Sequence, residues 1–210
     1  MKTNRLAIMG LFVALMCVSA WMRIPIPTPL GITYLTFQTA VAILAALLLA
    51  PHEAFFAMAA YVILGLVGLP VFANPGFAGL GYLASPTFGY LLGFVLGAPL
   101  GSLYLNRRLP EELGDISAHG FLKGLELTGP NAAAKRYGFT QCLLASLIVI
   151  MAVYVCGVTY IWAYARWIVG APEPYRSLIT TTSAFLWIKD SILGVVIASI
   201  APRLRAIVDH

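Results

Sequence analysis

Two ionisable residues, Lys189 and Asp190, stand side by side within the apolar stretch 178–200. A charged side chain at the centre of a membrane helix costs about 2.5–3.5 kcal/mol, so it is rarely left without a partner. A ligand or ion site is the functional hypothesis, and a polar lock between helices is the alternative. Adjacent helical residues point about 100° apart and do not face one spot, although the long lysine stem can bend around.

Two amides could join such a site. Gln38 lies in the string TFQT at 36–39, beside Thr36, and Asn74 follows Phe72 and Ala73. An amide donates and accepts hydrogen bonds, which suits a ligand and equally suits a contact between helices. Asn74 precedes a proline, and Asn-Pro also forms turns. Each amide therefore has a binding and a structural interpretation.

Several aromatic residues could stack on a flat ligand. They are Phe72, Tyr82, Tyr90, Tyr154 and Trp187. Aromatic side chains are also common anchors at membrane interfaces, which is the alternative for each.

The segment from Gly65 to Phe94 carries several of these residues and no charge. A water-exposed connector is usually polar, because its backbone and side chains face solvent. This glycine-rich and proline-rich apolar loop is therefore expected to fold back over a small ligand.

Enzyme and metal motifs are absent from the sequence. It holds no HExxH, no GxSxG and no GxxxxGK[ST] phosphate loop. His52, His119 and His210 are isolated, and the three cysteines show neither CxxC nor Cys/His spacing. We expect no catalytic residues, no metal and no cofactor, and no ATP hydrolysis by this chain alone.

The composition is that of a polytopic membrane protein. Of 210 residues, 60% are hydrophobic and 10% are charged, and the mean hydropathy is +0.89. Soluble domains carry about 25% charged residues. The net charge of +5 does not indicate nucleic acid, because the basic residues stand at the ends of apolar stretches.

The predicted fold class is all-α, a single membrane domain over 1–210 with six transmembrane helices. Prolines separate most of the apolar stretches. The expected spans are 6–23, 33–50, 54–69, 86–106, 137–165 and 178–200, with a larger loop over 107–136.

The distribution of Lys and Arg predicts the orientation. With six spans, nine of these residues fall on the side of both termini and three on the other side. Cytoplasmic segments carry the excess of positive charge. Both termini are therefore expected in the cytoplasm, and the 70–85 loop on the outer face of the plasma membrane.

Gly10 and Ala14 form a small-xxx-small pair in the first span. Such pairs allow the backbone of another helix to approach closely. Docking of a partner and packing within the bundle are both open interpretations.

The sequence resembles the BioY family, the biotin-specific substrate-binding (S) component of energy-coupling factor (ECF) transporters. The resemblance runs over nearly the whole chain and is carried by GLPVFAN at 68–74, SPTFGYLLGF at 85–94, TFQT at 36–39 and AFLWIKDSILG at 184–194. It implies six helices, biotin held near the outer surface, and docking on a membrane scaffold subunit driven by two cytoplasmic ATPase subunits.

The resemblance also implies roles for particular residues. In the family, the outer loop and an acid and a lysine of the sixth helix contribute to the pocket. The corresponding residues here are Phe72, Asn74, Tyr82, Tyr90 and the Lys189–Asp190 pair. Scaffold docking falls on Gly10 and Ala14.

Two of these motifs depart from the family's pattern. Phe88 replaces a glycine of GPTGGY, and the helix-six pattern PF..GD..K places Lys189 at the acid position and Ile192 at the lysine position. An S component for thiamin or riboflavin, or a structural membrane protein that binds a partner, is the alternative function.

Overall fold

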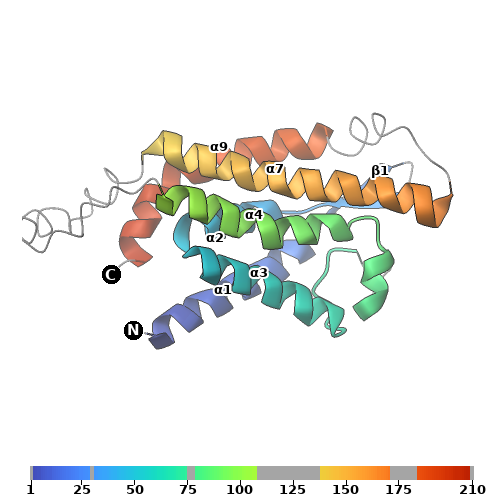
Figure 1. Cartoon of the computed structure of the whole chain (residues 1–210), viewed down its shortest axis with the longest axis horizontal. Coiled ribbons are helices and arrows are strands. Elements are labelled where there is room, and N and C mark those ends of the chain that lie inside the picture. Colours follow the sequence, from blue (N-terminus) through green and yellow to red (C-terminus); the bar gives the residue numbers. More distant parts are fainter. Residues whose placement is uncertain (1, 29–30, 75–78, 108–137, 171–183, 209–210) are drawn as a thin grey trace, which may run out of the picture.

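The computed structural model describes residues 2–28, 31–74, 79–107, 138–170 and 184–208. Within these residues the chain is mostly helical, with one two-stranded hairpin (Figure 1). The elements are α1 (Lys2–Trp21), β1 (Ile24–Thr28), β2 (Gly31–Leu35), α2 (Gln38–Leu48), α3 (Pro51–Leu66), the 3₁₀ turn η1 (Gly79–Ala84), α4 (Phe88–Arg107), α7 (Phe139–Tyr164), the π turn η2 (Ala165–Val169) and α9 (Ala184–Val208).

The turn between α2 and α3 shows how local sequence sets the helix bounds. Pro51 is the first residue of α3, where its missing N–H and fixed φ are tolerated. The Glu53 carboxylate accepts the backbone N–H of Ala50 at 2.9 Å, which closes the first turn of α3. Arg5 of α1 pairs with the same carboxylate at 3.3 Å. The carboxylate that caps α3 therefore also contacts the first turn of α1.

The fold is mostly helical, as expected, but the hairpin corrects the expected bounds of the second span. Residues 33–35, assigned to the second span, belong to β2, which pairs antiparallel with β1. In that register Pro25 lies opposite Tyr34, and Pro27 lies opposite Ile32. Proline cannot donate to a ladder but is accommodated in an edge strand, and both strands of a two-stranded sheet are edges. α1 ends at Trp21, and both prolines lie within β1, where they are compatible with the strand.

The last helix extends beyond its expected end. α9 continues to Val208, through Pro202, whereas the expected span ended at residue 200. The first residues of that expected span, 178–183, lie outside the described residues, as does the expected loop 107–136 except for Arg107. Arg107 is the last residue of α4.

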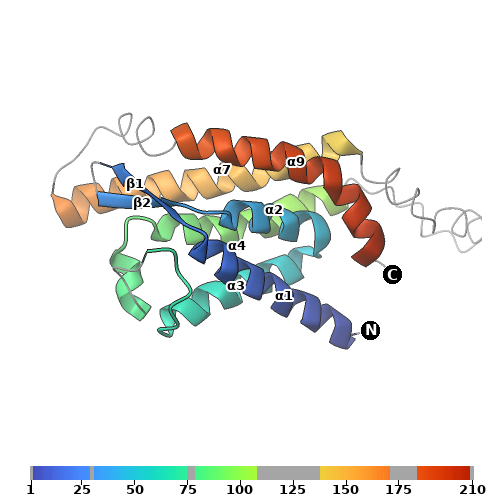
Figure 2. The ribbon, with the colours of Figure 1, turned by 180° about the vertical axis from the view of Figure 1, so that it is seen from behind.

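The two ends of the bundle differ in what they carry. The start of α1 lies near the end of α9, so both chain ends lie at one end of the bundle (Figures 1 and 2). The β1–β2 hairpin and η1 lie at the opposite end in both views. We call this second end the hairpin end.

Close packing of α4 on α7 gives the bundle its centre. Gly89, Gly93, Gly97 and Gly101 recur every four residues on α4, and an added Cβ at each would lie within 3.1 Å of an atom of α7. At Gly93 the nearest atom is the backbone Cα of Val153, at 2.5 Å. Small residues at this spacing let two membrane helices approach backbone to backbone. The α4–α7 pair is thus a rigid support for the side chains at the hairpin end.

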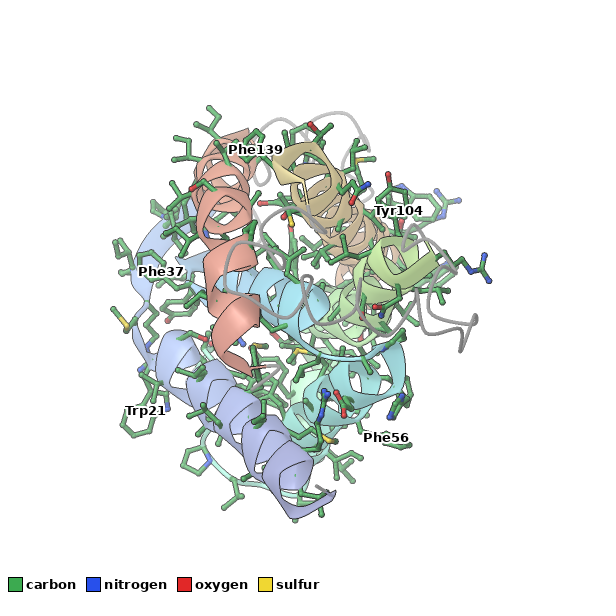
Figure 3. The ribbon with its side chains drawn as sticks, turned by 90° about the vertical axis from the view of Figure 1, so that its left-hand side faces the viewer. Trp21, Phe37, Phe56, Tyr104 and Phe139 are labelled. Atoms are coloured by element: carbon green, nitrogen blue, oxygen red, sulfur yellow. The ribbon has the colours of Figure 1, made fainter. Side chains whose placement is uncertain are left out.

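The outside of the bundle is apolar. Trp21, Phe37, Phe56 and Phe139 lie around its periphery, with exposed fractions from 37% to 67% (Figure 3). Among the described residues, Phe88–Arg107 and Phe139–Ile168 are helices long and apolar enough to cross a membrane. An apolar surface of this extent is expected of a protein surrounded by lipid.

The small pair on α1 faces outward. Gly10 and Ala14 are both exposed, and no atom lies within 4 Å of a Cβ built on Gly10. Packing within the bundle, one of the two interpretations of this pair, is therefore wrong for Gly10. Phe12 and Met16 point inward from α1 instead, with exposed fractions of 4% and 0%.

Candidate functional site

A pocket opens at the hairpin end. It lies where β2, α2, α4, α7 and α9 meet the segment after α3, which we define as residues 70–74. Its lining combines hydroxyl, amide, charged and aromatic side chains. The lining residues are Thr33, Tyr34, Thr36, Gln38, Thr39, Ala73, Asn74, Tyr82, Thr87, Tyr90, Leu91, Phe94, Tyr154, Leu186, Lys189 and Asp190.

Asp190 is the buried acid of this pocket. Its exposed fraction is 3%, and one carboxylate oxygen, Oδ2, accepts hydrogen bonds from Thr39 Oγ1 at 3.1 Å and Tyr154 OH at 2.8 Å. The donors come from α2 and α7, so the carboxylate ties both helices to α9. A buried carboxylate needs such partners, because an isolated charge in an apolar interior is strongly unfavourable.

Lys189 supplies the positive charge beside it. Its Nζ lies 2.8 Å from Oδ1 of Asp190 and donates to the backbone carbonyl of Thr36, at the junction of β2 and α2. The lysine stem therefore bends around the helix, and both members of the pair line one pocket. The pair presents a donor and an acceptor next to each other with little net charge.

The segment after α3 forms another wall. Ala73 and Asn74 line the pocket together with Tyr82 of η1, which is 2% exposed. Burial raises the pKa of the Tyr82 hydroxyl above its ordinary value. The hydroxyl lies 3.4 Å from Thr87 Oγ1. At neutral pH it is therefore an uncharged group that can both donate and accept.

A further wall is aromatic. Tyr90 of α4 meets Tyr154 of α7 edge to face, with ring centroids 5.9 Å apart. Gly157, one turn along α7 from Tyr154, leaves space for the Tyr90 ring, because an added Cβ would lie 2.5 Å from it. The apolar part of a ligand would contact these rings.

Arg23 and Trp21 hold the segment after α3 from the other side. Arg23 donates to the carbonyl of Ala73 at 2.7 Å and lies over the ring of Tyr34, and Trp21 donates to the carbonyl of Pro70 at 3.0 Å. The end of α1 and the hairpin thus fix the pocket wall. Arg23 is a wall support here and not a lining residue.

Most of the predicted binding residues come together in this pocket. Those that line it are Gln38, Asn74, Tyr82, Tyr90, Tyr154, Lys189 and Asp190. Phe72 does not line it but packs behind Tyr82, with ring centroids 4.2 Å apart. Trp187 is 44% exposed and contacts Tyr154 from outside the lining. The roles of Phe72 and Trp187 in binding remain predictions, whereas the other seven residues line the pocket.

Sequence reasoning missed three threonines of the lining. Thr39 was quoted within TFQT without a role, yet it donates to Asp190. Thr33 and Thr87 reach the pocket from β2 and from the start of α4. The available signal for Thr39 was its spacing from Thr36, since residues three apart share a helix face, but α2 begins only at Gln38.

The chemistry of this pocket is suited to binding. Within the described part of the chain, no three His, Cys, Asp or Glu side chains gather as a metal site. Apolar walls with a few placed polar groups are typical of small-molecule sites. The fold and the pocket together describe a helical membrane protein with a small-molecule site at one end.

The chain belongs to the BioY family, because the model of that family matches residues 1–210. A curated relative from Thermotoga maritima, the biotin transporter BioY, is 46% identical over 89 residues, which are 42% of this chain and 50% of the relative. A probable biotin transporter BioY from Lysinibacillus sphaericus is 41% identical over 97 residues, 46% of each chain. The chain spans about half the length of the curated relatives it matches.

A solved structure shares the fold. It is the crystal structure of the S-component for biotin from an ECF-type ABC transporter, with a TM-score of 0.71 over 97% of this chain and 92% of that chain. The two sequences are 20% identical, so the likeness shows a common fold.

Proposed function

We propose that this chain is the biotin-binding subunit of an energy-coupling factor transporter. It would capture biotin at the outer face of the membrane for ATP-driven uptake by partner subunits. The observation that carries the proposal is the pocket at the hairpin end, in a chain of the BioY family whose curated relatives are named biotin transporters. The biotin S-component that shares the fold supports it.

Biotin and the pocket have matching chemistry. The fused rings and the valeryl chain are apolar and suit Tyr82, Tyr90 and Tyr154. The ureido group offers two N–H donors and one carbonyl acceptor. Lys189 Nζ and Asp190 Oδ1 are 2.8 Å apart, so they can hydrogen-bond to neighbouring atoms of the ureido group. We assign the ureido carbonyl to Lys189 and a ureido N–H to Asp190, with Gln38 and Asn74 beside them.

The valeryl carboxylate then lies away from the charged pair. Biotin carries its carboxylate at the end of a flexible chain, several bonds from the ring. A carboxylate close to Asp190 would be repelled by the like charge. The pocket wall supported by Arg23, with its backbone amides, is the expected environment of this group.

Isothermal titration of the purified chain tests the function. Biotin should bind saturably, whereas thiamin and riboflavin should not. Biotin methyl ester should keep most of the affinity, because its ureido group is intact. 2-Iminobiotin should bind weakly, because a cationic guanidino group replaces the carbonyl acceptor that faces Lys189. Binding of another vitamin without heat from biotin would overturn the assignment of the substrate and leave the fold standing.

The six-span topology is part of the proposal. α2 has 11 residues, or about 16 Å, which is shorter than the roughly 30 Å hydrocarbon core. The five residues of β2 add about 17 Å in line with it. A strand followed by a helix would make the second crossing, with α1, α3, α4, α7 and α9 making the others.

The ends of the bundle support the proposed orientation. Both chain ends lie opposite the hairpin end (Figure 2). The excess of Lys and Arg on the side of the termini favours a cytoplasmic location for them. Membrane-impermeant maleimide applied to intact cells should therefore not label a cysteine added at either terminus. Labelling there would reverse the orientation.

Docking on the scaffold subunit is assigned to Gly10 and Ala14. Both are exposed on α1, where a second helix can approach closely. The partners would be an ECF transmembrane scaffold and two cytoplasmic ATPase subunits. Gly10→Leu should keep biotin binding but lose co-purification with the scaffold, and an intact complex with this variant would refute the docking face.

A further inference from the structure

A row of hydrogen bonds runs from Thr36, at the junction of β2 and α2, to the segment after α3 (residues 70–74). Thr36 Oγ1 donates to Gln38 Oε1 at 3.2 Å, and Gln38 Nε2 donates to Tyr61 OH at 2.7 Å. Tyr61 OH then donates to the carbonyl of Val71 at 3.0 Å. All three donors point the same way, and hydrogen bonds aligned in this manner polarise and strengthen one another.

The charged pair of the pocket stands at the beginning of this row. Lys189 Nζ donates to the backbone carbonyl of Thr36 and pairs with Asp190. A ligand that draws on Lys189 therefore acts on the residue where the row starts. At its other end, the row reaches the carbonyl of Val71, two residues before Ala73, which lines the pocket with Asn74.

Tyr61 joins the two halves of this row, because its hydroxyl accepts from Gln38 and donates to Val71, although it does not line the pocket. Its side chain is 0% exposed, and its ring packs edge to face on Phe72 with centroids 5.6 Å apart. Gly65, one turn further along α3, leaves room for the ring of Phe72, because an added Cβ would lie 2.1 Å from Phe72 Cζ. Phe72 in turn packs on Tyr82. One face of α3 thus holds both the carbonyl of Val71 and the ring of Phe72.

We propose that Tyr61 is a positioning residue that couples the Lys189–Asp190 pair to the segment 70–74, through Gln38 and Thr36. The inference rests on the proposed biotin site and adds to it how contacts on α9 set the position of the opposite wall. Removing the Tyr61 hydroxyl leaves the Val71 carbonyl and the Gln38 amide without their partner. Because both groups are buried or half-buried, the loss loosens the segment rather than exchanging protein contacts for water.

The first test measures how accessible the segment is without any ligand. In the full chain with Cys17, Cys142 and Cys156 replaced by alanine, Ala73→Cys places a thiol at a position that is 9% exposed. Adding Tyr61→Phe, which keeps the ring on Phe72, should raise the rate of maleimide labelling by about tenfold, the effect of losing roughly 1.4 kcal/mol. Hydrogen–deuterium exchange of the peptide 70–74 in the otherwise native chain gives the same readout where the cysteine-free chain does not fold.

A double-variant cycle tests the row itself. Thr36→Val removes the Oγ1 donor while keeping the side-chain size, and it should also raise labelling at position 73. Combined with Tyr61→Phe it should add little, because residues of one hydrogen-bond network are not independent. Additive effects would overturn the coupling. Tyr104→Phe is the matched control, because it removes a tyrosine hydroxyl near the C-terminal end of α4, away from the hairpin end. It should leave labelling unchanged (Figure 3).

The ligand arm separates positioning from general stability. With biotin, Tyr61→Phe should raise the dissociation rate constant about tenfold and change the association rate constant little. A lower melting temperature with unchanged labelling and unchanged dissociation would overturn the proposal, because a merely structural residue behaves that way. A parent chain that does not bind biotin would refute the proposed function, while the labelling arm would still decide the role of Tyr61.

Discussion

Replacing Asp190 by asparagine is expected to weaken biotin binding by at least about tenfold, or roughly 1.4 kcal/mol. The carboxylate is buried, accepts hydrogen bonds from Thr39 and Tyr154, and pairs with Lys189. An amide leaves the partly buried lysine ammonium without its counter-charge, and the variant should lose folding stability, by less than the roughly 3–5 kcal/mol typical of a fully buried pair. Isothermal titration and a thermal melt of the purified variant measure the two effects.

Two further variants separate the charge from the hydrogen bonds. Tyr154→Phe removes one donor to Asp190 and keeps the ion pair, so its effect on affinity should be smaller than that of Asp190→Asn. Asp190→Asn combined with Lys189→Met should cost less than the sum of the single changes, because the double variant leaves no lone charge. Unchanged affinity in Asp190→Asn would assign the carboxylate to holding helices together and remove it from the ligand site.

Gly93→Ala is expected to lower the free energy of unfolding by about 1–3 kcal/mol or more. The added Cβ would lie 2.5 Å from the Cα of Val153 and 3.0 Å from its carbonyl oxygen. Backbone atoms cannot turn aside as a flexible side chain can, so α4 and α7 must separate. The pocket should suffer too, because Tyr90 and Tyr154 stand on these two helices. Thermal unfolding in detergent and biotin titration give both readouts.

Gly10→Ala is the matched control for this prediction. It makes the same change within a helix, but no atom lies within 4 Å of the new Cβ. Alanine exceeds glycine in helix propensity by up to about 1 kcal/mol, so the control should be as stable as the parent or more stable. Equal melting temperatures for Gly93→Ala and Gly10→Ala would contradict the close approach of α4 and α7.

The long helices could be predicted from the sequence because their apolar runs are uninterrupted. The expected spans 86–106 and 137–165 correspond to Phe88–Arg107 and Phe139–Tyr164 within one or two residues. The hairpin could not be predicted in the same way. Prolines at 25 and 27 indicate a break, but a break gives no sign that the chain continues as a paired strand. The register depends on residues 31–35, which also suit an apolar helix.

The pocket was partly predictable for a different reason. A lysine and an aspartate inside an apolar stretch need partners, so the sequence marks them as unusual without saying what they meet. Their meeting depends on how far the lysine stem bends, and the Thr39 contact depends on the packing of α2 against α9. The glycine repeat on α4 was present in the sequence, yet a similar pair on α1 faces outward. Spacing alone does not say which helix face finds a neighbour.

A structure of the purified chain determined at saturating biotin would decide where the vitamin binds. We expect the fused rings at the hairpin end between Tyr82, Tyr90 and Tyr154, with the ureido group against Lys189 and Asp190. The segment 70–74 should contact the ligand through Asn74. Biotin bound anywhere else on the bundle, or no bound biotin under these conditions, would contradict the assignment of this pocket.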